Sequence, residues 1–135
     1  MPSWIRKRLS EKDFIMSDME QALKKLGDLR EKAVLGGGKE KIKKLKEKGY
    51  LTCDERIALL VDPDTFVEWN TFAGPQPAEF GPDPPYIPRD GVITGFASVS
   101  GRTVGVYAHD KTVQGGSLGN VQAAKIAQLI RKCCE

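Results

Sequence analysis

The chain has 135 residues, of which 40% are hydrophobic and 29% charged, and this composition is typical of one small folded domain. It contains no apolar run of the roughly 20 residues that a membrane-spanning helix needs. The first ten residues are basic and lack the apolar core of a secretory signal. We therefore expect a cytoplasmic protein with no membrane span.

The three cysteines are Cys53 and the neighbouring pair Cys133 and Cys134. They form neither an even disulfide framework nor a metal-binding motif, so we expect reduced thiols and no metal site. The net charge of +3 is unevenly distributed, because residues 1–50 carry 14 Lys and Arg against 8 Asp and Glu. The basic excess lies mainly in Lys39–Lys48. Such a run suits a nucleic acid, an acidic membrane or the phosphates of a ligand, but most often it is a solvated helix face.

The first half of the chain has the pattern of a helical arm. We interpret residues 1–17 as a basic N-terminal tail and residues 18–62 as the arm. Apolar residues at helical spacing predict a helix over Asp18–Leu35, which the three glycines at 36–38 end. A second helix is expected over Lys39–Lys48, up to Gly49.

A third helix is expected to begin after Thr52, because Thr52 and Glu55 have the spacing of a capping box. Asp62-Pro63 ends it, and a short strand follows at residues 66–69. We expect the apolar stripes of the three helices to find few partners within the chain.

The second half, residues 63–135, has the pattern of an α/β domain. Six prolines predict an irregular loop over Gly74–Arg89, and alternating apolar residues predict a hairpin that turns at Ser100-Gly101. A glycine loop over Gln114–Gly119 then precedes a helix that begins near Asn120 and is apolar on most of its circumference. Such a helix is normally buried on several sides.

The glycine loop is the first candidate binding site. Backbone amides and the helix dipole converge at such a place, which is typical of anion sites, although a plain structural turn is the alternative. Neither this loop nor Gly36–Lys39 has the P-loop pattern. The sole histidine, His109, stands beside Asp110 in a strand, where adjacent side chains point to opposite faces and do not form a dyad. Ser117 has no base within its motif.

Taken together, these segments resemble the amino-terminal part of the carboxyltransferase (beta) subunit of biotin-dependent acyl-CoA carboxylases, such as propionyl-CoA carboxylase beta. The related acyl-CoA decarboxylase alpha subunits are similar too. The residues that carry the resemblance, from about Met19 to the end of the chain, are Gly49, Leu51, Thr52, Glu55, Arg56, Ile57, Phe66, Glu68, Asp90, Gly91, Val92, Thr94, Gly95, Gly101, Arg102, Asp110, Thr112, Val113, Gly115, Gly116, Ser117 and Gly119.

The resemblance implies a partial crotonase/ClpP-like ββα carboxyltransferase domain that follows the helical arm. It also implies an N-terminal segment or split subunit of an enzyme that moves a carboxyl group between carboxybiotin and an acyl-CoA such as propionyl-CoA. The family's catalytic backbone amides lie on glycine turns beyond Glu135. We therefore assign no catalytic residue and expect no activity of the chain alone.

Substrate contacts implied by the resemblance lie in the glycine loop, at Gly115, Gly116, Ser117 and Gly119. On the basic helix, Lys43 and Lys44 are candidates for contacts to the phosphates of coenzyme A. The resemblance further implies an oligomer whose partners are the remaining carboxyltransferase chain, the biotin carboxylase and the biotin carrier subunit, with biotin held by a partner and no nucleic acid involved. The alternative is a non-catalytic assembly or regulatory subunit that docks on a longer carboxyltransferase.

Overall fold

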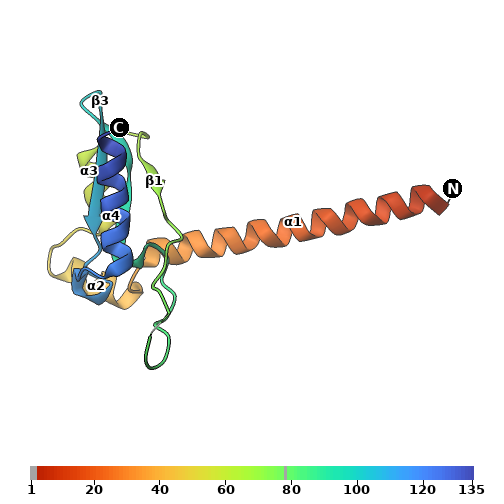
Figure 1. Ribbon diagram of the computed structural model, residues 1–135, viewed down its shortest axis with the longest axis horizontal. Coiled ribbons are helices and arrows are strands. Elements are labelled where there is room, and N and C mark those ends of the chain that lie inside the picture. Colours follow the sequence, from red (N-terminus) through yellow and green to blue (C-terminus); the bar gives the residue numbers. More distant parts are fainter. Residues whose placement is uncertain (1–2, 78) are drawn as a thin grey trace. The chain divides into compact units, whose positions relative to one another are not determined.

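The computed structural model describes residues 3–77 and 79–135. The chain divides into two compact units, Met1–Glu31 and Lys32–Glu135. Helix α1 (Ser3–Leu35), labelled in Figure 1, supplies the described part of the first unit, and its residues from Lys32 onward are counted in the second. The strands and the other helices all belong to the second unit, so the candidate sites lie there.

The start of α1 corrects one expectation. The helix begins at Ser3 instead of near Asp18, so the segment interpreted as a tail is helical from Ser3, while residues 1–2 lie outside the described part. The physical reason is that no glycine or proline interrupts the chain between Ser3 and Asp18. The polar residues Ser17 and Asp18, which could cap a helix, therefore lie in its interior. The predicted end is confirmed at Leu35, whose carbonyl accepts a bond from the Gly38 amide at 2.7 Å.

Helices α2 (Lys39–Glu47) and α3 (Cys53–Leu60) follow. The capping box of α3 is confirmed in both directions. The Glu55 amide donates to Thr52 Oγ1 at 3.3 Å, and the Thr52 amide donates to Glu55 Oε2 at 2.8 Å. Two of the amides that a helix start leaves free are thereby satisfied, which fixes where α3 begins.

The sheet has three antiparallel strands in the order β1 (Val67–Trp69), β2 (Val92–Val99), β3 (Arg102–His109). The hairpin turn at Ser100-Gly101 is confirmed, and both residues have positive φ, as a tight two-residue turn requires. Asp62 binds this turn from outside the hairpin, because its carboxylate accepts bonds from the Ser100 and Gly101 amides, each at 2.9 Å. A hydrogen bond from the Ser98 hydroxyl, and next these two bonds, hold the pKa of Asp62 below its ordinary value.

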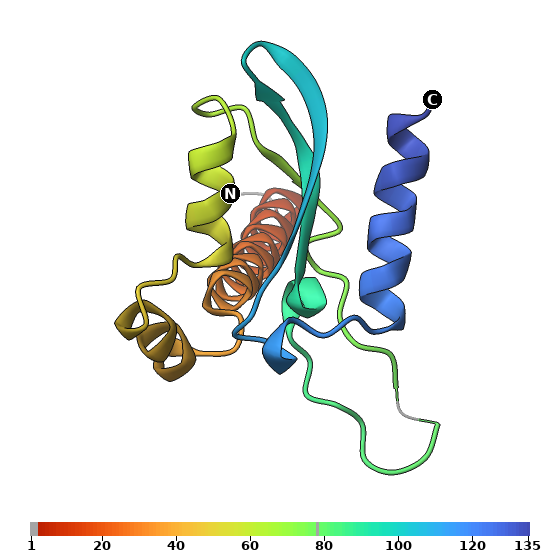
Figure 2. The same cartoon turned by 90° about the vertical axis from the view of Figure 1, so that its left-hand side faces the viewer.

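Helices cover both faces of the sheet, α3 on one side and α4 (Asn120–Cys133) on the other (Figure 2). On the α3 side, Cys53 and Ile57 pack against strand residues to form the hydrophobic core, together with Ile93, Ala97 and Val106. The expectation that the apolar stripes of the three helices find few partners within the chain is therefore wrong for α3. A single sequence shows that a stripe is apolar, but it does not show which sheet face will cover it.

The thiol of Cys53 lies in this core. Burial, which outweighs the nearby Arg56 charge, raises the pKa of Cys53 to about 11, and the thiol contacts the Ala108 carbonyl oxygen at 3.4 Å. A thiol with so high a pKa is almost fully protonated at neutral pH, so Cys53 acts as a small apolar side chain. Cys133 and Cys134 are exposed and free.

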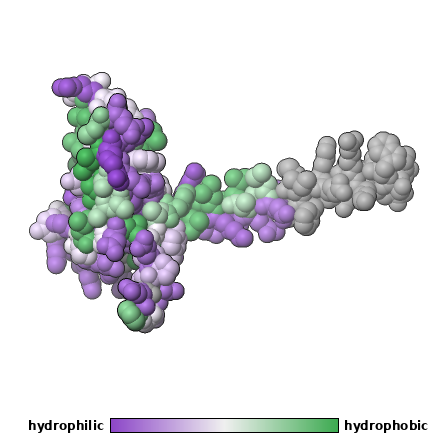
Figure 3. Space-filling view, viewed as in Figure 1, coloured by the Kyte–Doolittle hydropathy of each residue, from purple (hydrophilic) through white to green (hydrophobic). Residues whose placement is uncertain are grey.

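Helix α4 lies close to the sheet because β3 has a glycine beneath it. A Cβ at Gly105 would overlap Cys133 Sγ and lie 3.4 Å from Leu129 Cγ. The buried residues of α4 are Gln122, Lys125 and Leu129, while Ile130 is 53% exposed. The expectation of burial on several sides is thus wrong, because only the stripe that faces the sheet is covered. Apolar patches interrupt the hydrophilic surface around α4 and the sheet (Figure 3).

The proline-rich segment is irregular, as predicted, between β1 and the 3-10 turn Pro88–Gly91. Its ends are tied together by Tyr86, whose hydroxyl donates to the Phe72 carbonyl at 2.8 Å and whose ring packs against Gly74. No helix in the described part of the chain is both long and apolar enough to cross a membrane.

Candidate ligand-binding site

The glycine loop lies at the end of β3 and leads into α4. Gln114–Gly116 form a single 3-10 turn, in which Gly115 and Gly116 have φ values of 68° and 82° that other residues rarely adopt. Gly115, Ser117 and Gly119 are exposed, and Gly116 is half-buried. The loop is therefore an accessible surface that the two glycines shape.

A pocket of about 360 Å³ opens beside the end of this loop. Gln114, Gly119 and the first turn of α4 form one wall, and the proline-rich segment forms the other. The lining residues are Pro75, Gln76, Pro77, Glu79, Pro84, Asp90, Gln114, Gly119, Asn120, Val121 and Gln122. We call this the amide pocket, after its three glutamines and one asparagine.

The chemistry of the amide pocket differs from that of the anion site that the sequence suggests. Among the described residues, its lining contains Glu79 and Asp90 and no lysine or arginine. The Gly119 amide, which would face an anion at the helix start, already donates to Gln122 Oε1. The pocket therefore suits a neutral ligand with hydrogen-bonding groups better than a phosphate.

A second pocket, of about 180 Å³, carries the positive charge. Four lysines line it together with Leu45 and Thr112, namely Lys41 and Lys44 of α2, Lys48 directly after the helix, and Lys111. We call it the lysine pocket. Lys41, Lys44 and Lys48 share one face because they are three and four residues apart. Lysine ammonium groups bind phosphates by charge-assisted hydrogen bonds. The Lys111 ammonium also lies 4.9 Å from the centre of the Tyr50 ring.

The structure separates the two lysines that the sequence proposed together. Lys44 lines the lysine pocket. The Lys43 side chain is 80% exposed and lies 4.0 Å from Glu47 Oε1, on another face of α2. A contact of Lys43 with the same phosphate is therefore not supported by its position.

One short segment, Lys111–Gly119, connects the two pockets. Lys111 and Thr112 line the lysine pocket, and Gln114 and Gly119 line the amide pocket. In Figure 2, α2, the Gln114–Gly116 turn and the start of α4 follow one another from left to right. The segment is fixed at its start, because Thr112 Oγ1 donates to Asp110 Oδ1 at 2.7 Å and accepts from the Gly37 amide at 2.9 Å.

The wall of the amide pocket rests on a buried ion-pair network. Arg89 binds Glu68 through two bonds, Nε to Oε1 at 2.9 Å and Nη2 to Oε2 at 2.7 Å. Its guanidinium also binds Asp54 at 3.0 and 3.1 Å and donates to the Ala33 carbonyl. One side chain thus connects the end of α1, helix α3 and strand β1.

Lys125 and Gln122 of α4 hold the same turn from the other side. Lys125 Nζ donates to the carbonyl of Arg89 at 2.9 Å and to that of Val92, and Gln122 Nε2 donates to the carbonyl of Asp90. Burial lowers the pKa of Lys125 to about 8. A lysine in this place has a structural role, since backbone carbonyl oxygens accept hydrogen bonds from its ammonium group.

The remaining polar groups near the loop do not form a catalytic centre. His109 Nδ1 is buried and has no hydrogen-bond partner in the described part of the chain, and Asp110 is engaged by Thr112. Within the described residues, no three His, Cys, Asp or Glu side chains converge in a way that could hold a metal ion.

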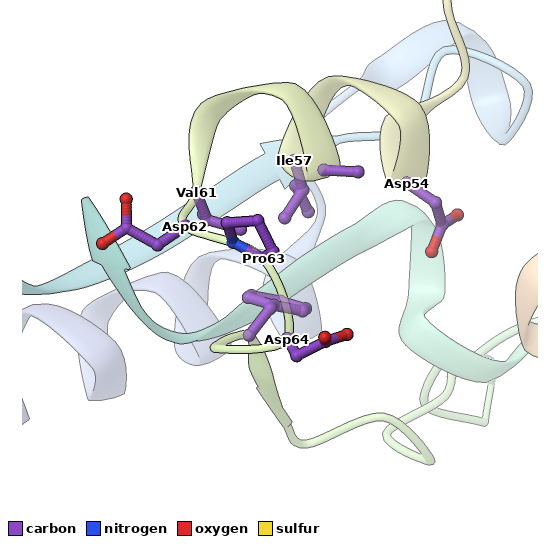
Figure 4. A pocket seen from close by; sticks show the side chains of 8 residues that line it. Asp54, Ile57, Val61, Asp62, Pro63 and Asp64 are labelled. Atoms are coloured by element: carbon purple, nitrogen blue, oxygen red, sulfur yellow. The ribbon is translucent and has the colours of Figure 1, made fainter. Parts of the chain in front are cut away.

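A larger pocket, of about 620 Å³, runs along α3 and the connection to β1 (Figure 4). Ile57, Val61 and Phe66 supply apolar lining, and Asp54 and Asp62 lie toward its two ends. Both carboxylates serve the fold, since Asp54 pairs with Arg89 and Asp62 binds the hairpin turn. None of the residues proposed from the sequence lines this pocket, so we do not regard it as the functional site.

Sequence reasoning missed Asp90 and Lys111 as site residues. Lys41 and Lys48 could have been selected with Lys44 by their helical spacing, a signal that was present in the sequence. Asp90 and Lys111 gave no such signal, because tertiary structure alone brings them to their pockets.

A family model described as a carboxyl transferase domain matches residues 44–134, which include the lining of the amide pocket and that of the lysine pocket except for Lys41. The chain belongs to the carboxyl transferase family. It is 44% identical to the propionyl-CoA carboxylase, carboxyltransferase subunit of Haloferax mediterranei over 117 residues, which are 87% of this chain and 23% of that protein. It is 36% identical to the methylmalonyl-CoA decarboxylase subunit alpha of Veillonella parvula over 116 residues, 86% of this chain and 23% of that one.

Solved structures agree with this membership. The crystal structure of transcarboxylase 12S, a hexamer with methylmalonyl-coenzyme A bound, matches 84% of the chain with a TM-score of 0.78 and 34% identity. A single-chain long-chain acyl-CoA carboxylase matches 82% with a TM-score of 0.69 and 26% identity. The α/β crotonase-type fold implied by the resemblance is thereby confirmed. The chain spans 22% and 12% of those two chains and is a partial carboxyltransferase segment.

Proposed function

We propose that this segment supplies part of the acyl-CoA binding surface of a biotin-dependent carboxyltransferase. The complete enzyme would move a carboxyl group between carboxybiotin and an acyl-CoA such as propionyl-CoA. The observation that carries the proposal is the pairing of a lysine pocket with an amide-rich pocket, whose lining has no lysine or arginine among the described residues, on the two ends of one short segment, Lys111–Gly119. Coenzyme A has the same division, since charged phosphates occupy one end and a neutral amide-bearing arm the other.

In this account each group of residues has a defined task. Lys41, Lys44, Lys48 and Lys111 bind phosphate oxygens, and the exposed glycines let the ligand approach the backbone between the two pockets. We assign no catalytic residue to the segment. Its contribution is to bind and orient the substrate, which lowers the entropic part of the reaction barrier.

The partners in this proposal are the remaining carboxyltransferase chain, a biotin carboxylase and a biotin carrier subunit, within an oligomer. Biotin would be attached to the carrier, and its ring would supply the carboxyl group that is transferred. The described residues offer the ring no recognised site, so no step is assigned to it here. The transferase and decarboxylase directions are both compatible with this binding role.

Charge reversal at Lys44 tests the phosphate contact. We expect Lys44→Glu to weaken binding of adenosine 3′,5′-bisphosphate by tenfold or more, because a charge-assisted hydrogen bond contributes about 1.5–3 kcal/mol. Lys43→Glu is the matched control, with the same charge change on the same helix but outside the pocket. Isothermal titration calorimetry of both variants and the unchanged chain at one salt concentration measures the difference.

Equal losses in the two variants would mean that the lysines act only through long-range charge, which contradicts a built phosphate site. The second candidate function, a non-catalytic assembly subunit, is favoured by the exposure of Ile130 on α4. A docking subunit does not need to bind coenzyme A. The absence of adenosine 3′,5′-bisphosphate binding in the unchanged chain would therefore support that alternative.

A further inference from the structure

Strand β3 has one edge that no described strand covers. It stands last in the order β1-β2-β3 and pairs with β2 along its whole length. Ladder bonds alternate in an antiparallel pair, and the Asp110 amide donates to the Gly91 carbonyl oxygen at 2.8 Å, one position beyond the last strand pair. The backbone groups that point away from β2 are therefore those of Thr103, Gly105, Tyr107 and His109. We call this row of groups the β3 edge.

The β3 edge lacks the features that usually keep an edge strand from pairing. Residues 103–108 contain no proline and no charged side chain, and the pairing with β2 runs without a bulge. Thr103, Gly105 and Tyr107 are exposed. The His109 carbonyl oxygen accepts a bond from Arg56 Nη2 at 2.6 Å, which closes the edge at that end. A further strand can therefore add along Thr103–Tyr107.

The flank of α4 on the same side of the sheet is apolar. Asn70, which follows β1, donates to Gln128 Oε1 at 3.0 Å, so the Gln128 side of α4 is turned toward β1. Ile126 and Ile130 lie two positions before and after Gln128, about 160–200° around the helix, and so are turned toward β3. Ile130 is 53% exposed. We call the stripe at this helical spacing the α4 flank, and its residues are Ala123, Ile126, Ile130 and Cys133.

A second copy of the chain fits the β3 edge. If β3 pairs with itself in antiparallel fashion about a twofold axis at Gly105, Thr103 lies opposite Tyr107 of the second copy. The outward amides of each strand then meet the outward carbonyl oxygens of the other.

The same twofold axis brings the two α4 helices to packing distance. Helix α4 packs against both β2 and β3, so it lies over the gap between them. The axis lies half a strand spacing beyond β3, which places each α4 one full strand spacing from it. With strands about 4.8 Å apart, the two helices are about 10 Å apart, within reach of the 8–10 Å at which helices usually pack.

The two α4 flanks would meet without a charged side chain between them. Gly105 lies beneath the end of α4, because a Cβ there would overlap Cys133 Sγ and lie 3.4 Å from Leu129 Cγ. A twofold axis at Gly105 therefore passes close to Ile130 in both copies. The helices would run antiparallel, an arrangement that their dipoles favour, and the exposed isoleucines would be removed from water.

We propose that two copies of this chain associate through the β3 edge and the α4 flank and form one continuous antiparallel sheet. This interface goes beyond the proposed function, since none of its residues lines the lysine pocket or the amide pocket. The competing occupant of the edge is a strand of another polypeptide, such as the remaining carboxyltransferase chain. That occupant needs no second copy, so the two are distinguished by experiment.

Sedimentation equilibrium and amide hydrogen exchange of the 135-residue chain test the proposal. We expect the mass to rise with concentration toward twice the chain mass of 14.9 kDa. At concentrations that populate the dimer, the amides of Thr103, Gly105 and Tyr107 should exchange at least tenfold more slowly than in the monomer. The amides of Val104, Val106 and Ala108 point toward β2 and should be protected in both states, which makes them the internal reference.

Two pairs of variants locate the interface. Ile130→Glu should raise the dissociation constant of the dimer tenfold or more, because it puts two carboxylates into an apolar contact near the axis. Ala124→Glu is the matched control, since Ala124 is exposed and lies on the Gln128 flank of the same helix. Thr103→Pro removes an outward amide without removing a bond to β2 and should weaken the dimer, whereas Thr103→Val keeps the amide and should not.

Several results would overturn this proposal. A chain that keeps the monomer mass at submillimolar concentration, with fast exchange at the β3 edge, would leave that edge to a strand of another polypeptide. A dimer with unprotected edge amides, or one that Ile130→Glu and Ala124→Glu weaken equally, would use a different surface. If Ile130→Glu does not fold, the comparison of Thr103→Pro with Thr103→Val decides. None of these results bears on coenzyme A binding, so the proposed function is tested separately.

Discussion

Replacing Arg89 with methionine is expected to lower the free energy of unfolding by about 3–5 kcal/mol, the usual cost of breaking a buried ion pair from one side. Arg89 binds two carboxylates and a carbonyl. Its loss leaves Glu68, whose side chain is 16% exposed, without its cation. Burial raises the pKa of Asp54 and the Arg89 charge opposes that rise, so the variant also removes the group that stabilises the ionised form of this carboxyl. Urea denaturation followed by circular dichroism measures the change.

The control for Arg89→Met is Arg102→Met, an exposed position on β3, where we expect a change below about 0.5 kcal/mol. Adding Glu68→Gln to Arg89→Met should recover part of the lost stability, because it removes the unpaired charge. A loss in Arg89→Met no larger than that of the Arg102→Met control would show that the network does not hold the turn.

Gly37→Ala is expected to destabilise the second unit by about 1–3 kcal/mol, the typical cost of forcing an extra methyl into a packed site. A Cβ at Gly37 would overlap the carbonyl oxygen and carbon of Thr112, so backbone must move against backbone. The same shift would break the 2.9 Å bond from the Gly37 amide to Thr112 Oγ1, at the start of the segment that joins the two pockets.

Thermal unfolding of Gly37→Ala against Gly27→Ala isolates this contact. Gly27 lies in α1, and a Cβ added there would meet no described atom within 4 Å. Alanine at this position should therefore be neutral or stabilising, by up to about 1 kcal/mol. Two variants of equal stability would contradict the close approach of the glycine turn to Thr112. A stable Gly37→Ala variant with normal ligand binding would also show that position 37 does not require a glycine.

The parts of the fold that local chemistry decides were predictable from the sequence. The capping box of Thr52 and Glu55, the turn at Ser100-Gly101 and the helix end before Gly36 each depend on residues within a few positions of one another. The start of α1 was not predictable in this way. Ser17-Asp18 caps a helix only if the residues before it are not helical, and here they are. The role of α3 was missed because its partners lie far away in the sequence.

The residues of the candidate site also differ in how far the sequence predicts them. A basic helix beside a glycine loop could be proposed from the residues, and the choice of Lys44 is supported by its position, whereas that of Lys43 is not. The anion character of the loop depended on free amides, and the Gly119 amide is occupied by a side chain one helical turn away. Asp90 becomes a candidate only when burial and the proline-rich wall are known.

Titration of the ¹⁵N-labelled chain with intact coenzyme A tests the central claim most directly, namely that one ligand spans both pockets. We predict that the amide signals of Lys41–Lys48 and of Lys111–Gln122 shift together along one binding curve. Coenzyme A should also bind more tightly than adenosine 3′,5′-bisphosphate, since linking two binding groups raises their effective concentration. Shifts confined to the lysine helix that vanish with modest salt would contradict the account, because they would indicate a charged surface without a built site.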